Sequence, residues 1–121
     1  MSTFSEKMLN AVDYERVQAI RQENFQWLHQ QLSPFNQLII DVPSNTTCFR
    51  YPFLPSKLIP KGPFYQEKLF IPSFWSDVHQ RPIDGFEWEK RLSQQLFPLP
   101  IDHRYRTDDL QRLVAFILKQ L

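Results

Sequence analysis

A short corner near the C-terminal end of the chain gathers the residues best suited to chemistry. Asp102, His103, Arg104 and Tyr105 follow directly after Pro98-Leu99-Pro100-Ile101, where two prolines stiffen an extended backbone. Stiff backbone next to polar side chains positions those side chains accurately, which suits a binding or catalytic site. A purely structural role is the alternative, in which Asp102 pairs with Arg104 and Tyr105 packs over the start of the next helix.

Trp75 is the second candidate for contact with a ligand. It follows Pro72-Ser73-Phe74 at the end of an expected strand. A large aromatic side chain at such a position either faces a ligand or joins the core. The sequence leaves both roles open.

Other common chemistries lack their residues in this chain. The three histidines, His29, His79 and His103, stand far apart without a second histidine or cysteine at ligand spacing, so we expect no metal site. No Gly-x-Ser-x-Gly elbow exposes a serine nucleophile, and Cys48 is expected to pack inertly within a strand. With only 2 glycines, the chain also lacks the phosphate-cradling loops of common nucleotide sites.

The lysines do not indicate a cofactor site either. A lysine that forms a Schiff base with a pyridine coenzyme is desolvated beside a phosphate-binding loop and an acidic partner for the ring nitrogen. No lysine here lies in that context, so we expect the chain alone to bind no cofactor. The basic run from Lys57 to Lys68 contains Phe64 and Tyr65, which loosely fits a platform for single-stranded nucleic acid. The formal charge of +1 favours a solvated loop instead.

These residues must be positioned by a small globular domain. A chain of 121 residues with 42% hydrophobic residues and 11 phenylalanines can bury one core, so residues 1–121 are expected to form a single domain. The 14 basic and 13 acidic residues nearly cancel, which argues against electrostatic recruitment to nucleic acid or a membrane. A single cysteine, with no apolar run of signal-peptide or membrane-span length, predicts a cytoplasmic protein.

The hydrophobic pattern predicts a mixed α/β (α+β) fold. All 10 prolines lie between Pro34 and Pro100, so helices are expected at both ends and strands with turns in the middle. We expect a small antiparallel sheet of about three strands, packed against a long N-terminal helix and two C-terminal helices. The expected helices cover residues 14–32, 85–97 and 108–121, and the expected strands cover residues 37–42, 46–53 and 69–75.

Capping residues set the expected helix boundaries. Asp13, Asp84 and Thr107 are the expected N-caps of the three helices, and the Ser33-Pro34 step is expected to end the first. Residues 1–12 are expected either to be flexible or to extend that helix.

The first two strands are expected to pair as an antiparallel hairpin. Three prolines and Gly62 within residues 55–66 predict a loop with at most one turn near residues 57–59.

Three segments together resemble the closing part of DegT/StrS-type aminotransferases, which are pyridoxal-phosphate enzymes of nucleotide-sugar metabolism. The segments are Arg21-Gln22-Glu23-Asn24-Phe25-Gln26-Trp27-Leu28, then Leu69-Phe70-Ile71-Pro72-Ser73-Phe74-Trp75, and finally Leu99-Pro100-Ile101-Asp102-His103-Arg104-Tyr105 followed by Asp109-Leu110. They occur in the family's order and cover most of the chain. Only the family's C-terminal small domain is matched.

The resemblance implies a fold like the small domain of fold-type-I aminotransferases, with a long helix leading into a short antiparallel sheet backed by helices. It also implies that Trp75, His103, Arg104 and Tyr105 lie on the substrate side of a cleft. The family's large domain, which supplies the lysine, the phosphate cup and the carboxylate under the ring nitrogen, is not matched. The family usually has a helix between its second and third strands, where prolines and a glycine interrupt residues 60–63, so the strand order there stays open.

The function favoured by these observations is an isolated or truncated small domain of a sugar aminotransferase. It would not be catalytic alone and would need a large-domain partner, with pyridoxal phosphate held by that partner. Exposed Phe and Trp side chains left by a missing large domain would favour docking or a homo-oligomer. The alternative is a small protein- or peptide-binding module that uses the edge strand near residues 46–53 and no cofactor.

Overall fold

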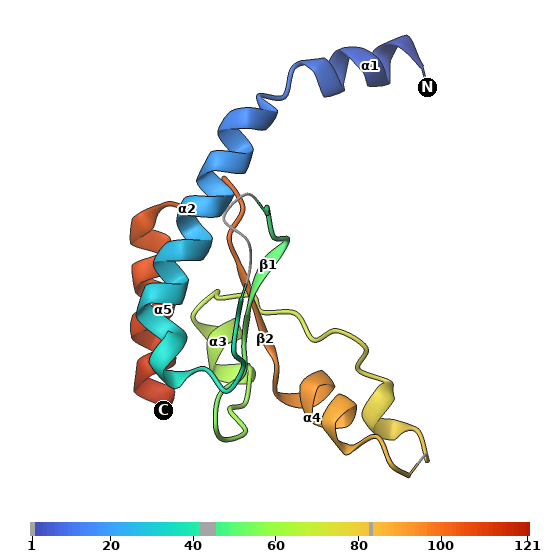
Figure 1. Cartoon of the computed structure of the whole chain (residues 1–121), viewed down its shortest axis with the longest axis vertical. Helices are drawn as coiled ribbons and strands as arrows, with labels where there is room; N and C mark the ends of the chain where they lie inside the picture. Colours follow the sequence, from blue (N-terminus) through green and yellow to red (C-terminus); the bar gives the residue numbers. More distant parts are fainter. Residues whose placement is uncertain (1, 42–45, 83) are drawn as a thin grey trace.

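The computed structural model describes residues 2–41, 46–82 and 84–121 and shows a mixed α/β domain, as predicted. In chain order its elements are α1 (Thr3–Asn10), α2 (Tyr14–Leu32), β1 (Arg50–Phe53), α3 (Gly62–Gln66), α4 (Glu87–Gln95), β2 (Phe97–Pro100) and α5 (Thr107–Gln120), with short 3-10 turns at Ser33–Phe35 and Val78–Gln80. Helices α2 and α5 lie side by side next to the two-stranded sheet, whereas α1 and α4 extend away from it (Figure 1).

The long helix α2 begins and ends where its sequence predicts. The side chain of Asp13 accepts a hydrogen bond from the backbone N–H of Arg16 at 3.1 Å, which satisfies a donor that the first helical turn leaves free. The helix ends at Leu32, and Pro34 continues the chain in a 3-10 turn. Its buried side chains, Asn24, Leu28 and Leu32, lie on one face at spacings of four residues.

The C-terminal helix α5 also forms as predicted, but its cap differs. Arg106, not Thr107, is the N-cap residue, and the carboxylate of Asp109 accepts a hydrogen bond from the backbone N–H of Arg106 at 2.9 Å. The negative charges of acidic side chains in the first helical turn also interact favourably with the positive N-terminal end of the helix dipole. The helix buries Leu110, Leu113, Val114 and Ile117 against α2 and the sheet.

The shorter helices depart further from the expectations. Helix α4 begins at Glu87 after the N-cap Phe86, so the expected cap at Asp84 is wrong. Helix α3 lies at Gly62–Gln66, where a loop was expected, because Pro63 fits the first turn of a helix and its missing N–H costs nothing there. Within residues 1–12, α1 forms a separate helix with no buried residue.

The sheet consists of β1 and β2 in antiparallel register, with Arg50 opposite Pro100 and Phe53 opposite Phe97. Neither member of the Pro52–Pro98 pair has an N–H group, so this pair is a non-hydrogen-bonded one. The pairs on either side of it therefore carry the ladder's hydrogen bonds. The three prolines of the sheet are Pro52, Pro98 and Pro100. A backbone N–H at any of these positions would point out of the sheet, so the absence of that N–H in proline removes no hydrogen bond from the ladder.

The outer edge of β1 is covered by an asparagine side chain. Asn36 donates from Nδ2 to the carbonyl of Pro52 at 3.0 Å, and its Oδ1 accepts from the N–H of Leu54 at 3.0 Å. The N–H of Gln37 then donates to the carbonyl of Leu54 at 2.8 Å. One side chain therefore takes the hydrogen bonds that a neighbouring strand would have made.

The prediction of about three strands is wrong, because within the described ranges the sheet has two strands. Residues 37–41 form no strand, since Asn36 already occupies the edge of β1 and Ile39 is 98% exposed; residue 42 lies outside the described residues. Residues 69–75 are irregular, because Lys68 and Trp75 adopt positive φ angles of 60° and 52° and Pro72 has no N–H to donate. The second strand is β2, which includes the last residue of the expected helix 85–97 and the stiff extended segment after it, and it pairs with the last four residues of the expected strand 46–53.

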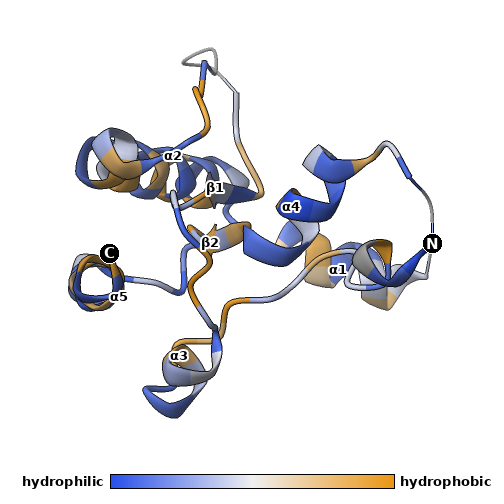
Figure 2. Ribbon diagram, turned by 90° about the horizontal axis from the view of Figure 1, so that it is seen from below, coloured by the Kyte–Doolittle hydropathy of each residue, from blue (hydrophilic) through white to orange (hydrophobic). Residues whose placement is uncertain are grey.

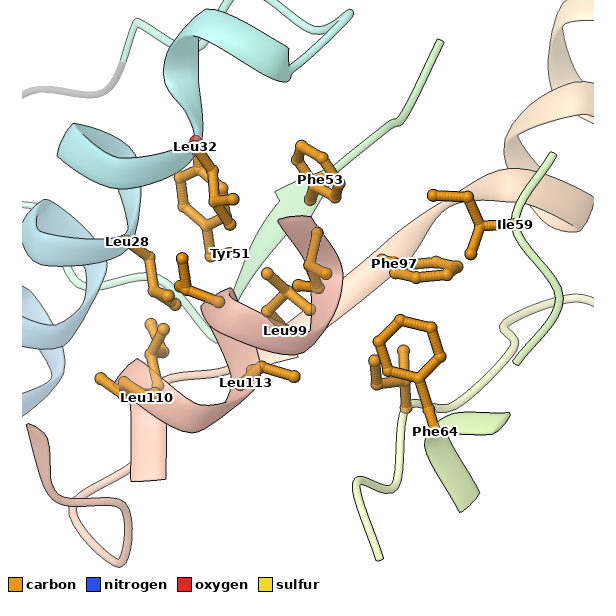
Figure 3. Close-up of a cluster of buried hydrophobic side chains, with 14 residues drawn as sticks. Leu28, Leu32, Tyr51, Phe53, Ile59, Phe64, Phe97, Leu99, Leu110 and Leu113 are labelled. Atoms are coloured by element: carbon orange, nitrogen blue, oxygen red, sulfur yellow. The ribbon is translucent and has the colours of Figure 1, made fainter. Parts of the chain in front are cut away.

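A single core joins these elements (Figure 3). Phe64 of α3 contacts both Phe97 and Phe116 in edge-to-face geometry, with ring centroids 5.2 and 4.7 Å apart. Tyr51, Phe53, Phe64 and Phe97 are completely buried. Most of the buried hydrophobic side chains come from α2, β1, α3, β2 and α5, which we call the body.

Residues 72–82 and 84–96, which we call the arm, project from the body and carry the Val78–Gln80 turn and α4. Among its described hydrophobic side chains, none is fully buried. Figure 2 shows α4 and α1 on the side of the molecule away from α2 and α5. Within the described ranges, none of the helices is both long enough and apolar enough to cross a lipid bilayer.

Candidate functional site

The corner at residues 101–105 is held in place by one buried side chain of α2. Nδ2 of Asn24 donates to the carbonyl oxygens of Ile101 at 3.0 Å, Asp102 at 3.3 Å and Tyr105 at 3.4 Å. The corner is also closed by a hydrogen bond from the N–H of Tyr105 to the carbonyl of Asp102 at 3.1 Å. Asn24 therefore joins two of the segments that carry the family resemblance and fixes the backbone that presents Arg104 and Tyr105.

Beside this corner lies a hollow of about 250 Å³ between α2, β1 and the end of β2, which we call the arginine hollow. Its polar residues are three arginines and one aspartate, and the others are mainly apolar or aromatic. The lining residues are Arg21, Phe49, Arg50, Pro100, Ile101, Asp102, Arg104 and Tyr105. The site therefore has an excess of positive charge, although the whole chain is nearly neutral.

The arginines of the hollow are held by backbone and side-chain acceptors. Arg21 donates to the carbonyl of Phe49 at 3.2 Å, and Arg50 donates to the carbonyl of Pro98 at 3.3 Å. The guanidinium of Arg50 also lies 5.2 Å from the ring centroid of Phe49, a cation–π contact. These contacts position both guanidinium groups without neutralising their charge.

Arg104 and Asp102 form an ion pair, as the structural interpretation of the corner predicted. Nε of Arg104 lies 2.9 Å from Oδ2 of Asp102. The hydrogen bond to Asp102, together with its negative charge, raises the pKa of Arg104. The pairing uses only one carboxylate oxygen of Asp102.

Among the described residues, two buried side-chain polar atoms have no hydrogen-bond partner: the donor Nε of Arg50 and the acceptor Oδ1 of Asp102. A buried donor or acceptor left unpaired costs about 1–3 kcal/mol, so such atoms are rare in folded proteins. Both residues line the same hollow.

The structure brings together only two of the four residues implied by the resemblance. Arg104 and Tyr105 line the arginine hollow. His103 lines a different hollow with residues 11–20, at the junction of α1 and α2. Trp75 lies in the arm and is 70% exposed, so it does not join the core.

Trp75 belongs to an apolar pocket of about 290 Å³, which we call the aromatic pocket. Its walls come from the 74–78 segment, α4 and the start of β2. The lining residues are Phe74, Trp75, Val78, Glu89, Leu92, Ser93, Leu96 and Pro98. The rings of Phe74 and Trp75 pack edge to face with centroids 5.7 Å apart. Trp75 also has a left-handed backbone conformation, with φ of 52°, which is uncommon for a residue other than glycine.

Lys61 meets one of the conditions for a Schiff-base lysine and lacks the others. Burial lowers its pKa to about 8. Its ammonium group donates to the carbonyl of Pro72 and to Oγ of Ser73, both at 2.9 Å, and lies 5.3 Å from the ring centroid of Phe97. These partners anchor the arm to the body and include no carboxylate for a pyridinium nitrogen. The contacts of Lys61 therefore do not fit a pyridoxal-phosphate site.

The sequence analysis missed the two arginines that define the hollow. Arg21 lies within a segment of the family resemblance, but its type alone did not distinguish it from other charged residues of the helix. Arg50 reaches the site because β1 pairs with β2, a pairing that the sequence analysis did not predict. Among the described residues, no three His, Cys, Asp or Glu side chains are grouped to hold a metal ion.

Comparisons of the chain with family models, curated proteins and solved structures find no significant match.

Proposed function

We propose that this chain is a small domain related to those of DegT/StrS aminotransferases, not catalytic alone, that works with a large-domain partner holding pyridoxal phosphate. The observation that carries the proposal is the exposed aromatic pocket of the arm. The proposal also draws on the three sequence segments that resemble the family. The single cysteine fits the cytoplasm, where we propose that the protein works.

The arm offers an apolar contact surface that its own chain leaves open. Trp75 is 70% exposed, Phe86 is 50% exposed and Trp88 is 47% exposed. Covering apolar surface is favourable by roughly 25 cal/mol per Å², and exposed aromatic side chains of this kind are typical anchors of protein interfaces. A partner that covers the aromatic pocket would gain this energy.

The polar groups of the body can bind charge but do not form a catalytic set. The carboxylate of Asp102 is paired with Arg104, and His103 lies in a different hollow from both. A nucleophile needs an adjacent base within hydrogen-bond reach, and these residues do not provide that pair. This arrangement fits a domain that contributes binding groups to a site completed by another domain.

The test is complex formation with a DegT/StrS large domain produced without its own small domain, measured by sedimentation velocity. We expect a one-to-one complex that Trp75→Ser weakens strongly. Phe4→Ser is the matched control, because Phe4 is an aromatic residue that is 72% exposed on α1, outside the arm and the pocket. Absence of a complex, or equal weakening by both variants, would contradict the proposal. Without the partner, we expect the same surface to cause weak self-association at high concentration.

A second candidate is a peptide-binding module that uses the aromatic pocket. The pocket's mainly apolar walls favour it, since such clefts commonly hold one aromatic or aliphatic side chain of a ligand. Addition of a peptide strand to β1 is disfavoured, because Asn36 occupies that edge and Pro52 has no N–H. Binding of short aromatic peptides, abolished by Trp75→Ser, together with no affinity for the large domain, would favour this second function.

A further inference from the structure

We propose that the arginine hollow is an interaction surface for an acidic peptide segment of a partner protein. This inference goes beyond the docking function, because the hollow and the aromatic pocket have no lining residue in common. It rests on the excess positive charge of the hollow, on the contacts that gather its arginines and on the exposure of its walls.

The charged residues that line the hollow favour an anion. Its three arginines, Arg21, Arg50 and Arg104, are accompanied by one acidic lining residue, Asp102. Asp102 forms an ion pair with Arg104, and within the described ranges neither Arg21 nor Arg50 forms an ion pair. Two guanidinium charges therefore remain without a counterion. Because charge acts over several ångströms, this excess attracts an anion whichever way the single N–H groups point.

Phe49 gathers the two guanidinium groups that have no counterion. Arg21 donates to the carbonyl of Phe49 at 3.2 Å, and the guanidinium of Arg50 lies 5.2 Å from the ring centroid of Phe49. Arg21 belongs to α2 and Arg50 to β1, so the fold brings both charges to the same residue. The hydrogen bond from Arg21 is exposed to solvent, so a carboxylate can approach this guanidinium group and pair with it.

The walls of the hollow suit a partner that covers them from outside. Phe49 is 69% exposed, and the side chain of Arg104 is 76% exposed. A small-molecule site encloses most of its ligand, which walls as exposed as these do not achieve. The ring of Phe49 also offers an apolar contact beside the two charges. A peptide with acidic residues next to an aromatic or aliphatic residue matches this combination.

The charge of the whole chain favours an acidic protein segment over nucleic acid. The chain has 14 basic and 13 acidic residues and a formal charge of +1. Nucleic acids are bound through many phosphate contacts along an extended basic surface, and a nearly neutral chain with one local excess does not match that pattern. A short acidic segment requires only the local excess.

The test is a calorimetric titration of the full chain with the peptide Glu-Glu-Phe-Glu-Glu, acetylated and amidated at its ends. The comparison ligands are Gln-Gln-Phe-Gln-Gln, inorganic phosphate and a short single-stranded oligothymidylate. We expect saturable one-to-one binding of the acidic peptide, no binding of the glutamine peptide, and weaker binding of phosphate and of the oligonucleotide. Added salt should weaken the binding, because the interaction is largely electrostatic.

Three variants assign the binding to the hollow. Arg21→Met and Arg50→Met should each lower the affinity for the acidic peptide about tenfold, since each removes a guanidinium that has no counterion. Phe49→Ser should lower it about threefold, because the apolar contact is lost. Arg91→Met is the matched control: it removes the same charge from the arm, and Arg91 lines neither the hollow nor the aromatic pocket.

The outcomes decide the inference separately from docking. Trp75→Ser, which should weaken docking, should leave acidic-peptide binding unchanged, because Trp75 does not line the hollow. Absence of saturable binding, equal loss of affinity in Arg91→Met and Arg21→Met, or tighter binding of phosphate or of the oligonucleotide would overturn the inference. Circular dichroism of each variant separates lost binding from lost folding, and Arg21→Met decides the matter if Arg50→Met fails to fold.

Discussion

The body and the arm contain the same kinds of aromatic residue and use them in opposite ways. In the body, Phe53, Phe64 and Phe97 are completely buried, and the rings of Phe53 and Phe64 both pack against Phe97. In the arm, Trp75 and Trp88 are 70% and 47% exposed. Aromatic content alone therefore does not show where a domain is stabilised, because burial decides what each ring contributes. The rings of the body stabilise its core, whereas the arm leaves its aromatic surface exposed.

The largest change in the free energy of unfolding is expected from removing the ring of Phe64, which lies between Phe97 and Phe116 in the body. Phe64→Ala leaves a cavity between Phe97 and Phe116 and should lower the free energy of unfolding by about 3–5 kcal/mol. Trp88→Ala, an equally drastic change in the arm, should alter it by less than about 0.5 kcal/mol. Urea titration of both variants measures the difference. Similar losses in the two variants would abolish the distinction between body and arm.

The next effect concerns the polar anchor of the corner. Asn24→Asp replaces an amide donor by a carboxylate that faces the carbonyls of Ile101, Asp102 and Tyr105, so it should cost about 2–3 kcal/mol. Gln26→Glu makes the same chemical change on the exposed face of α2 and should be nearly neutral. Urea unfolding of the pair checks this. An unchanged free energy of unfolding in Asn24→Asp would show that the corner does not depend on α2.

A smaller change in stability, dependent on pH, is expected from Lys61, which anchors the arm to the body. The pKa of Lys61 is about 8 in the folded chain and near 10.5 when unfolded, so the unfolded chain holds more protons between these pH values. The free energy of unfolding should therefore rise with pH from about 8 upward. At pH 7 and below, Lys61 is charged in both states, so the unfavourable burial of its charge lowers the free energy of unfolding by an amount that does not change with pH.

This pH dependence is measured by urea unfolding between pH 7 and 9.5. The upper limit of pH 9.5 keeps the ionisation of Tyr51 out of the measured range. Burial raises the pKa of Tyr51 above its ordinary value of 10.0, so its ionisation would lower the free energy of unfolding at higher pH. Lys61→Met should remove most of the rise, whereas Lys57→Met, at an exposed position, should leave it unchanged. A rise that persists in Lys61→Met would show that another group is responsible.

The smallest effect is expected from the ion pair of the arm. Nη2 of Arg81 lies 2.6 Å from Oδ2 of Asp77, and the two side chains are 60% and 61% exposed. Solvent screens such a pair, so Arg81→Gln should change the free energy of unfolding by less than about 0.5 kcal/mol. Thermal unfolding at low and high salt would reveal a larger role, and a marked salt-dependent loss would show that polar contacts stabilise the arm.

The two long helices could be predicted from the sequence because their signals are local. Asp13 caps α2, and apolar residues recur at helical spacing along both α2 and α5. The sheet could not be predicted in the same way. Strand β2 reads Phe-Pro-Leu-Pro, and its prolines are tolerated only because the register points their missing N–H groups outward. That register depends on a partner strand far away in the sequence.

The candidate site was predicted in part for the same reason. The corner at residues 101–105 is a local feature, and its Asp102–Arg104 pair follows from their spacing. Arg50 enters the site only through strand pairing, and Trp75 is separated from the corner by the path of the arm. Local patterns therefore identified single residues of the site, whereas long-range pairing determined which of them meet.

The most direct test of the claim that this chain works only with a cofactor-holding partner is an absorbance titration of the purified protein with pyridoxal phosphate. We predict no saturable aldimine band, because Lys61, the lysine whose pKa burial lowers, is anchored to Pro72 and Ser73. A saturable band that disappears in Lys61→Met and persists in Lys57→Met would contradict the claim.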